Sequence, residues 1–114
     1  MADPHPITGA FFDSPVPPGT GWPDDPATAA TPVARSATDV ARLAAASSEL
    51  SALDARVTVC RACDRLVAWR EEVARTGRRA SFAHEPYWGR PVASVGPADA
   101  RIYVVGLAPA ANGA

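Results

Sequence analysis

The stretch Arg101-Ile-Tyr-Val-Val-Gly-Leu-Ala-Pro-Ala-Ala-Asn-Gly-Ala114 decides the expected fold class of this 114-residue chain. Its four consecutive apolar residues, 102–105, are typical of a strand that is covered on both faces in a parallel sheet. Ligands of open parallel sheets bind at the carboxyl ends of the strands, so loop 106–113 is expected to lie where a pocket forms. The chain contains no second convincing strand to pair with this one. The stretch therefore predicts an α/β fold with an incomplete site.

Prolines divide the chain into an arm and a body. Eight of the twelve prolines lie in residues 1–35, which we assign as a proline-rich arm, and residues 36–114 form the body. The arm also carries large apolar side chains that solvated linkers usually lack, so part of it is expected to pack onto the body, with a free tail as the alternative. These side chains belong to Ile7, Phe11, Phe12, Val16 and Trp22.

The first helix is predicted to begin near Thr38 or Asp39, with Ser36 or Thr38 as its cap, and to end near Val57. Its apolar residues recur at alternating spacings of three and four residues, which predicts one narrow packing face, with a coiled-coil seam as the alternative. These residues are Leu43, Ala46, Leu50, Leu53 and Val57.

A second helix is predicted from Cys63 or Asp64 to Thr76, where Gly77 stops it. Residues 78–97 show no helical or strand period, so we expect a long connecting loop there. The residues that share one face of this helix are Leu66, Trp69 and Val73.

Charge and hydropathy exclude few functional classes. The formal net charge is −1, and all eleven basic residues are arginine, which suits phosphate but is also typical of a GC-rich genome. No apolar run approaches the roughly 20 residues that cross a bilayer, and residues 1–6 lack the regions of a signal peptide. We therefore expect a cytoplasmic protein without a membrane partner, whose two cysteines form no structural disulfide.

Cys60 and Cys63 form a Cys-x-x-Cys pair at the head of the second predicted helix, where a thiolate is favoured. A redox pair would normally follow a strand, whereas a helix precedes this one. A zinc site needs about four ligands, and only His84 and His5 are available besides the pair. An iron-sulfur cluster usually needs four cysteines. These three interpretations, and that of two structural cysteines, stay open on the residues alone.

Three residues of the connecting loop could contribute to a site. His84 could be a metal ligand, a proton carrier or a solvated loop histidine. Tyr87 and Trp88 could stack on a base or flank a cofactor, but aromatic residues of this kind more often pin a loop to its own core.

Loop 106–113 contains no acid, histidine, hydroxyl or lysine, so it is neither a phosphate-binding loop nor a nucleophile elbow. Small residues at the end of a strand do permit a planar ligand to approach the backbone amides closely. Asn112 could supply a polar contact or cap a following helix.

Together these segments resemble the type-b uracil-DNA glycosylases, the fifth family of that superfamily, over nearly the whole chain. The most specific segment is Gly106-Leu-Ala-Pro-Ala-Ala111, which is similar to the family's first active-site motif, although position 112 is Asn where the family has His. The other matching segments are Gly19-Thr-Gly-Trp-Pro23, Val59-Cys-Arg-Ala-Cys63, Leu66-Val-Ala-Trp-Arg-Glu-Glu72 and Tyr87-Trp-Gly-Arg-Pro-Val92.

The resemblance implies a three-layer α/β/α sandwich, of which this chain would be an amino-terminal fragment with an arm, two helices, a loop and the first core strand. It also implies a [4Fe-4S] cluster, with Cys60 and Cys63 as two of its four ligands. The implied reaction is hydrolysis of the N-glycosidic bond of uracil, and of other deaminated bases, in DNA. The intact protein is expected to be a monomer, and the fragment is expected to be inactive.

The resemblance places the substrate pocket at Gly106, Leu107, Ala108, Pro109, Ala110, Ala111 and Asn112. Related glycosylases carry Asp or Asn near the position of Ala108 to hold the attacking water, and a methyl group cannot do this. The catalytic polar group is therefore unknown and is expected beyond Ala114. Two rival functions are a non-enzymatic metal or redox module that uses Cys60, Cys63 and His84, and an interaction protein that binds a partner through the arm and the first helix.

Overall fold

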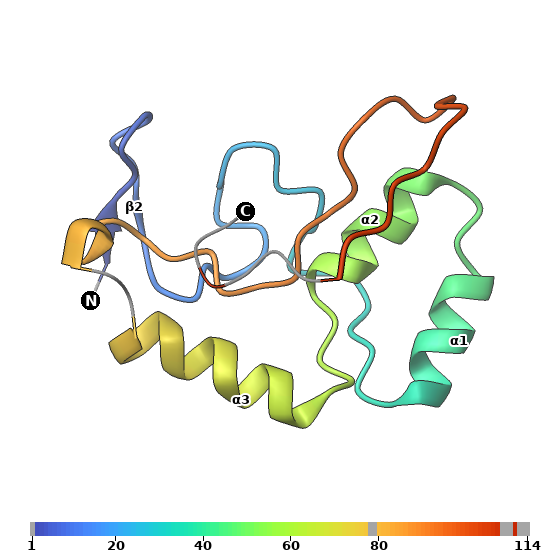
Figure 1. The fold of residues 1–114 in the computed structure, drawn as a ribbon, viewed down its shortest axis with the longest axis horizontal. Coiled ribbons are helices and arrows are strands. Elements are labelled where there is room, and N and C mark those ends of the chain that lie inside the picture. The colour runs from blue at the N-terminus through green and yellow to red at the C-terminus, as the bar shows by residue number, and fades with distance from the viewer. Residues whose placement is uncertain (1, 78–79, 108–110, 112–114) are drawn as a thin grey trace.

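In a computed structural model, which describes residues 2–77, 80–107 and 111, the chain folds into three short α-helices and a two-stranded hairpin (Figure 1). None of the helices in this described part has the length and apolar character that a bilayer crossing requires. In chain order the elements are β1 (Asp3–Pro4), β2 (Phe11–Phe12), α1 (Ala37–Ala45), α2 (Leu50–Thr58), α3 (Asp64–Glu72), a π-helical turn (Val73–Gly77) and a 3₁₀ turn (Ala80–Phe82).

The arm begins with an antiparallel hairpin that sequence analysis did not predict. β1 pairs with β2 so that Asp3 lies opposite Phe12, and Gly9 in the connecting turn adopts a positive φ of 71°. His5 closes the turn, because its Nδ1 accepts hydrogen bonds from the amides of Ile7 and Thr8 at 3.3 and 3.2 Å. This buried histidine is therefore part of the arm's own structure.

The arm packs onto the body, as predicted. The rings of Trp22 and Trp88 lie 5.7 Å apart, and the amide of Val16 donates to the carbonyl of Trp88 at 3.1 Å. Phe12 and Val16 are buried, whereas Ile7 and Phe11 remain exposed. The core consequently lies between the arm, the end of α2, α3 and the loop around Trp88.

Gly89 fixes how closely this loop approaches the arm. Its φ is +62°, and a Cβ atom added there would lie 2.5 Å from Cβ of Pro15. We expect Gly89→Ala to lower the free energy of unfolding by about 3 kcal/mol, the sum of left-handed backbone strain and overpacking. Urea denaturation of the complete protein measures this change.

Gly9→Ala is the matched control, because Gly9 has a similar φ of +71° but nothing within 4 Å of its added Cβ. It should show only the backbone cost, about 1 kcal/mol. Equal losses in the two variants would contradict the close packing of Gly89 against Pro15.

The single first helix predicted from sequence is divided into α1 and α2. α1 begins as expected, because the Ser36 side chain accepts from the amide of Asp39 at 3.1 Å. It ends at Ala45, and the freed carbonyl of Leu43 accepts from the Ser47 hydroxyl at 2.8 Å and from the Arg56 guanidinium at 2.6 Å. These side-chain bonds satisfy the helix end and allow α2 to turn back against α1 (Figure 1).

The second predicted helix is confirmed as α3 followed by the π-helical turn, which ends at Gly77. Its packing face differs from the expected one. Val67 and Val73 are buried, whereas Leu66 and Trp69 are each 54% exposed. The helix therefore rests on the arm and loop through the Val67 side.

The predicted core strand is not present among the described residues. Residues 102–105 have no strand assignment, and the side chains there are 77–86% exposed. The physical reason is that a strand requires a hydrogen-bonding partner, and the hairpin strands pair only with each other. The three helices and the small sheet are compatible with part of an α/β fold, and the three-layer sandwich stays a prediction.

The chain also exposes more surface than a folded monomer of its size. Its accessible surface is 7911 Å² for a mass of 11.8 kDa, against about 5,900 Å² expected from the usual scaling of surface with mass. The apolar run at 102–105 contributes to this excess.

Candidate metal centre and adjoining sites

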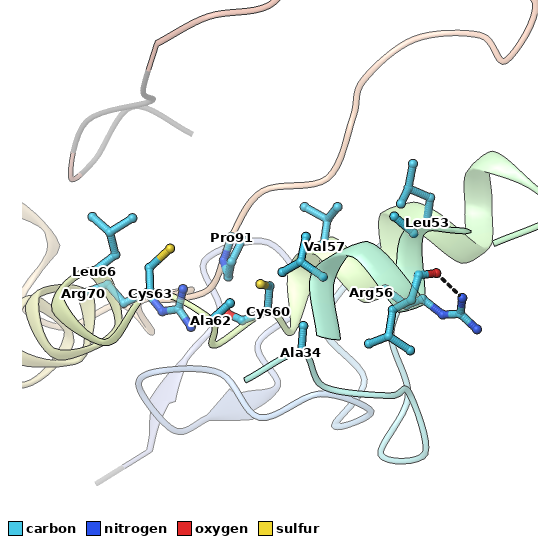
Figure 2. Close-up of a pocket in the computed structure, with 13 residues that line it drawn as sticks. Ala34, Leu53, Arg56, Val57, Cys60, Ala62, Cys63, Leu66, Arg70 and Pro91 are labelled. Atoms are coloured by element: carbon cyan, nitrogen blue, oxygen red, sulfur yellow. Dashed lines mark hydrogen bonds between the residues drawn. The ribbon is translucent and has the colours of Figure 1, made fainter. Parts of the chain in front are cut away.

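Residues 59–63, here called the cysteine loop, join α2 to α3 and carry both thiols. The two cysteines lie on one wall of an apolar groove of about 300 Å³ (Figure 2). The groove is lined by Ala34, Val40, Leu43, Ala44, Leu53, Arg56, Val57, Cys60, Ala62, Cys63, Leu66, Arg70 and Pro91.

Three hydrogen bonds from two parts of the chain, the arm and α3, hold the cysteine loop. The amide of Arg61 donates to the carbonyl of Ala34 in the arm at 2.8 Å. Its guanidinium pairs with Glu71 of α3 at 2.6 Å. The guanidinium of Arg70, also in α3, donates to the carbonyl of Cys60 at 2.9 Å. These bonds connect the cysteine loop to both the arm and α3.

Both thiols are available to a ligand. Cys60 is half-buried, Cys63 is exposed, and neither is in a disulfide. Cys63 is the N-cap residue of α3 but its side chain makes no capping hydrogen bond. The pair therefore places two free thiols in the loop that leads into the amino terminus of α3.

Among the residues that the structure describes, no third metal ligand lies with the pair. In the part of the chain that it describes, no three His, Cys, Asp or Glu side chains gather into a metal-binding group. His84 is exposed in its loop, and His5 accepts hydrogen bonds within the hairpin. The rival module with Cys60, Cys63 and His84 as joint ligands is therefore not favoured.

Arg90 forms a buried centre that sequence analysis did not predict. Its guanidinium makes two bonds to Asp25 of the arm, at 2.9 and 3.1 Å, with the two side chains only 8% and 4% exposed. It also donates to the carbonyl and hydroxyl of Thr58 at the end of α2. Burial raises the pKa of Asp25, but the bonds from Arg90 and the Ala27 amide outweigh it, so the carboxyl pKa is lowered.

The contacts of Arg90 distinguish between two roles for Trp88, which are stacking on a ligand and packing against the chain's own core. The Arg90 guanidinium lies 4.1 Å from the centroid of the Trp88 ring, and Trp22 packs 5.7 Å away. The indole Nε1 donates to the carbonyl of Pro91 at 3.1 Å. Trp88 is thus engaged by its own core, so a stacking role toward a base is not supported.

Only part of the predicted substrate pocket can be placed. Gly106 and Leu107 are exposed, and Ala108, Pro109, Ala110 and Asn112 lie outside the described residues. Ala111 accepts a hydrogen bond on its carbonyl from the Tyr87 hydroxyl, and the Tyr87 amide donates to the Ser14 hydroxyl at 2.7 Å. Burial raises the pKa of the Tyr87 hydroxyl. The loop at Tyr87 therefore links the arm to the segment that carries the motif.

Comparison with known proteins defines the class. A type-5 uracil-DNA glycosylase from Mycobacterium tuberculosis is 57% identical over 110 residues, or 96% of this chain and 41% of that relative. Another, from Thermus thermophilus, is 58% identical over 57 residues, or 50% of this chain and 25% of the relative. A third, from Pyrobaculum aerophilum, is 48% identical over 58 residues, or 51% of this chain and 24% of the relative. No family model and no solved structure matches the chain.

The chain is similar in sequence to DNA glycosylases. More particularly, its relatives are the type-5 uracil-DNA glycosylases, which confirms the resemblance found in the sequence. The chain spans 41% of the length of the relative from Mycobacterium tuberculosis.

Proposed function

We propose that the protein containing this chain is a uracil-DNA glycosylase. In this proposal it is a monomeric cytoplasmic enzyme that hydrolyses the N-glycosidic bond of uracil, and of other deaminated bases, in DNA. The observation that carries the proposal is the 57% identity to a type-5 uracil-DNA glycosylase over 96% of the chain. The target base must leave the duplex stack, and a mispaired base does so at lower cost. Hydrogen-bond donors directed at the departing base then stabilise its developing negative charge.

The proposed pocket wall is the segment from Gly106 to Asn112. Its small residues permit the backbone to approach a planar base, and within it the carbonyl of Ala111 accepts a hydrogen bond from the Tyr87 hydroxyl. Ala108 has no polar atom with which to hold water, so the water-orienting group is expected outside these 114 residues. We accordingly expect the 114-residue chain alone to be inactive.

The proposed cofactor is a [4Fe-4S] cluster with Cys60 and Cys63 as two of its four ligands. The chemistry of the donor set fits, because two free thiols share one wall of an apolar groove and clusters of this type are held by cysteine thiolates. Two further cysteines would have to come from outside this chain, which contains only two. When bound, the cluster would supply structural cross-linking between α3 and distant chain, with no electron transfer required for hydrolysis.

Release of uracil tests the proposed activity. We expect the complete protein to release uracil from duplex DNA that contains a U·G pair, measured as alkali-sensitive cleavage of a labelled strand. The same duplex with C·G is the control, because only the base differs. The 114-residue chain should give no cleavage above background. Absence of cleavage by the complete, iron-loaded protein would contradict the assignment.

A further inference from the structure

Arg70 lines the same groove as the two cysteines. Cys63 is the N-cap residue of α3, and Leu66 and Arg70 follow it at spacings of three and four residues, which places all three on one face of the helix. All three line the groove, and Figure 2 shows Arg70 beside the cysteine loop. Its bond to the carbonyl of Cys60, at 2.9 Å, spans the loop from the helix.

Arg70 has no carboxylate partner among the ion pairs of the described residues. The neighbouring acid, Glu71, pairs instead with Arg61 at 2.6 Å, and the next acid, Glu72, pairs with Arg75 at 2.7 Å. The other guanidinium in the groove, that of Arg56, is bonded to the carbonyl of Leu43. The Glu71 carboxylate also attracts Arg70, but it is shared with Arg61, so these three side chains together carry one net positive charge beside the cysteine loop.

Such a charge is unfavourable unless an anion lies near it. The groove wall is mostly apolar and Arg70 is half-buried, so water screens its charge incompletely. Besides Glu71, which it shares with Arg61, the groups beside Arg70 that are negative as metal ligands are the sulfur atoms of Cys60 and Cys63. A guanidinium remains charged in proteins, so this positive charge is permanent.

We propose that Arg70 is a positioning residue for the metal centre: it holds the cysteine loop through the Cys60 carbonyl and sets a permanent positive charge beside the ligand sulfurs. This inference rests on the cluster proposed above. Residues outside the ligand set commonly tune a metal site in this manner, through hydrogen bonds and charge. The positive charge should slow loss of the cluster and favour its reduced state, which carries one more negative charge.

The test compares Arg70→Gln and Arg70→Lys in the complete protein, purified without oxygen. Gln keeps a hydrogen-bond donor but removes the charge, and Lys keeps the charge. Arg75→Gln is the matched control, because Arg75 follows in the same helical segment, is exposed, and does not line the groove. The two readouts are iron transfer to the chelator ferrozine and the midpoint potential from a dithionite titration.

For Arg70→Gln we expect iron transfer about tenfold faster than in the control. We also expect the reduction equilibrium to shift about tenfold toward the oxidised form, which is about 59 mV for one electron. Arg70→Lys should retain the potential of the unmodified protein. If Arg70→Gln does not fold, a change of potential in Arg70→Lys as large as tenfold overturns the inference.

The outcomes distinguish the role of Arg70 from the proposed cluster and from the proposed glycosylase activity. If Arg70→Gln equals Arg75→Gln in both readouts while both bind iron, the role of Arg70 is overturned and the cluster stands. If the unmodified protein binds no iron, the cluster and the role of Arg70 fall together. Uracil release is measured independently, so glycosylase activity is judged apart from either result.

Discussion

Replacing Arg90 with methionine is expected to lower the free energy of unfolding by about 3–5 kcal/mol, because it leaves the Asp25 carboxylate buried without its partner. Asp25 is only 4% exposed, and Thr58, which also loses its bond to the guanidinium, is fully buried. The total free energy of unfolding of a small domain is about 5–15 kcal/mol. The variant should therefore be close to unfolded at 37 °C, as measured by urea denaturation of the complete protein.

Two further variants test the cause of this loss. Arg75→Met removes an exposed arginine whose partner, Glu72, is also exposed, and it should leave the denaturation midpoint unchanged. The double variant Arg90→Met with Asp25→Leu removes both charges and should recover most of the stability, because no unpaired charge remains buried. A loss in Arg90→Met below about 1 kcal/mol would show that the ion pair is not a structural centre.

Cys60→Ser in the complete protein is expected to lose bound iron and a large part of the folded structure together. Metal binding to a folded site contributes directly to folding free energy, about 10–16 kcal/mol for structural zinc in small peptides. Here the cysteine loop joins α2, α3 and the arm, so loss of the metal would release all three. Iron content, visible absorbance and the far-ultraviolet circular dichroism spectrum measure the two losses in parallel.

Ala68→Ser supplies the control for this exchange. Ala68 is exposed on α3 and does not line the groove, so the variant adds the same hydroxyl without removing a ligand. It should retain iron and fold. A Cys60→Ser protein that keeps full uracil release without iron would contradict a structural role for the cluster.

Local signals in the sequence were sufficient for the start of α1 and for the end of the helical segment that begins with α3. Ser36 caps α1 as predicted, and Gly77 marks the end of the helical segment that begins at Asp64. The interruption between α1 and α2 was not predicted, because apolar spacing continues through it. It depends on the pairing of the Leu43 carbonyl with Arg56, thirteen residues away, and no local pattern reports such a contact.

In the candidate site, too, the local motif could be predicted from the sequence and the long-range contacts could not. The Cys-x-x-Cys spacing identified the cysteine loop, but the bonds that hold it join Arg61 to Ala34 and Arg70 to Cys60. The Arg90–Asp25 pair was missed because its partners are 65 residues apart and neither residue type signals burial. The strand at 102–105 was predicted from a run of four consecutive apolar residues, whereas strand formation requires a partner.

The distance along the chain between Asp25 and Arg90 has a consequence during synthesis. A ribosome adds about 5–20 residues per second, so the 65 residues between them take about 3–13 s to follow. Throughout that interval the arm, the segment of α2 and the cysteine loop have emerged or are emerging without the arginine that joins them. Until Arg90 has been synthesised, Asp25 has no ion-pair partner and the arm stays solvated. We therefore expect the synthesis of Arg90 to limit the rate at which the arm folds onto the body.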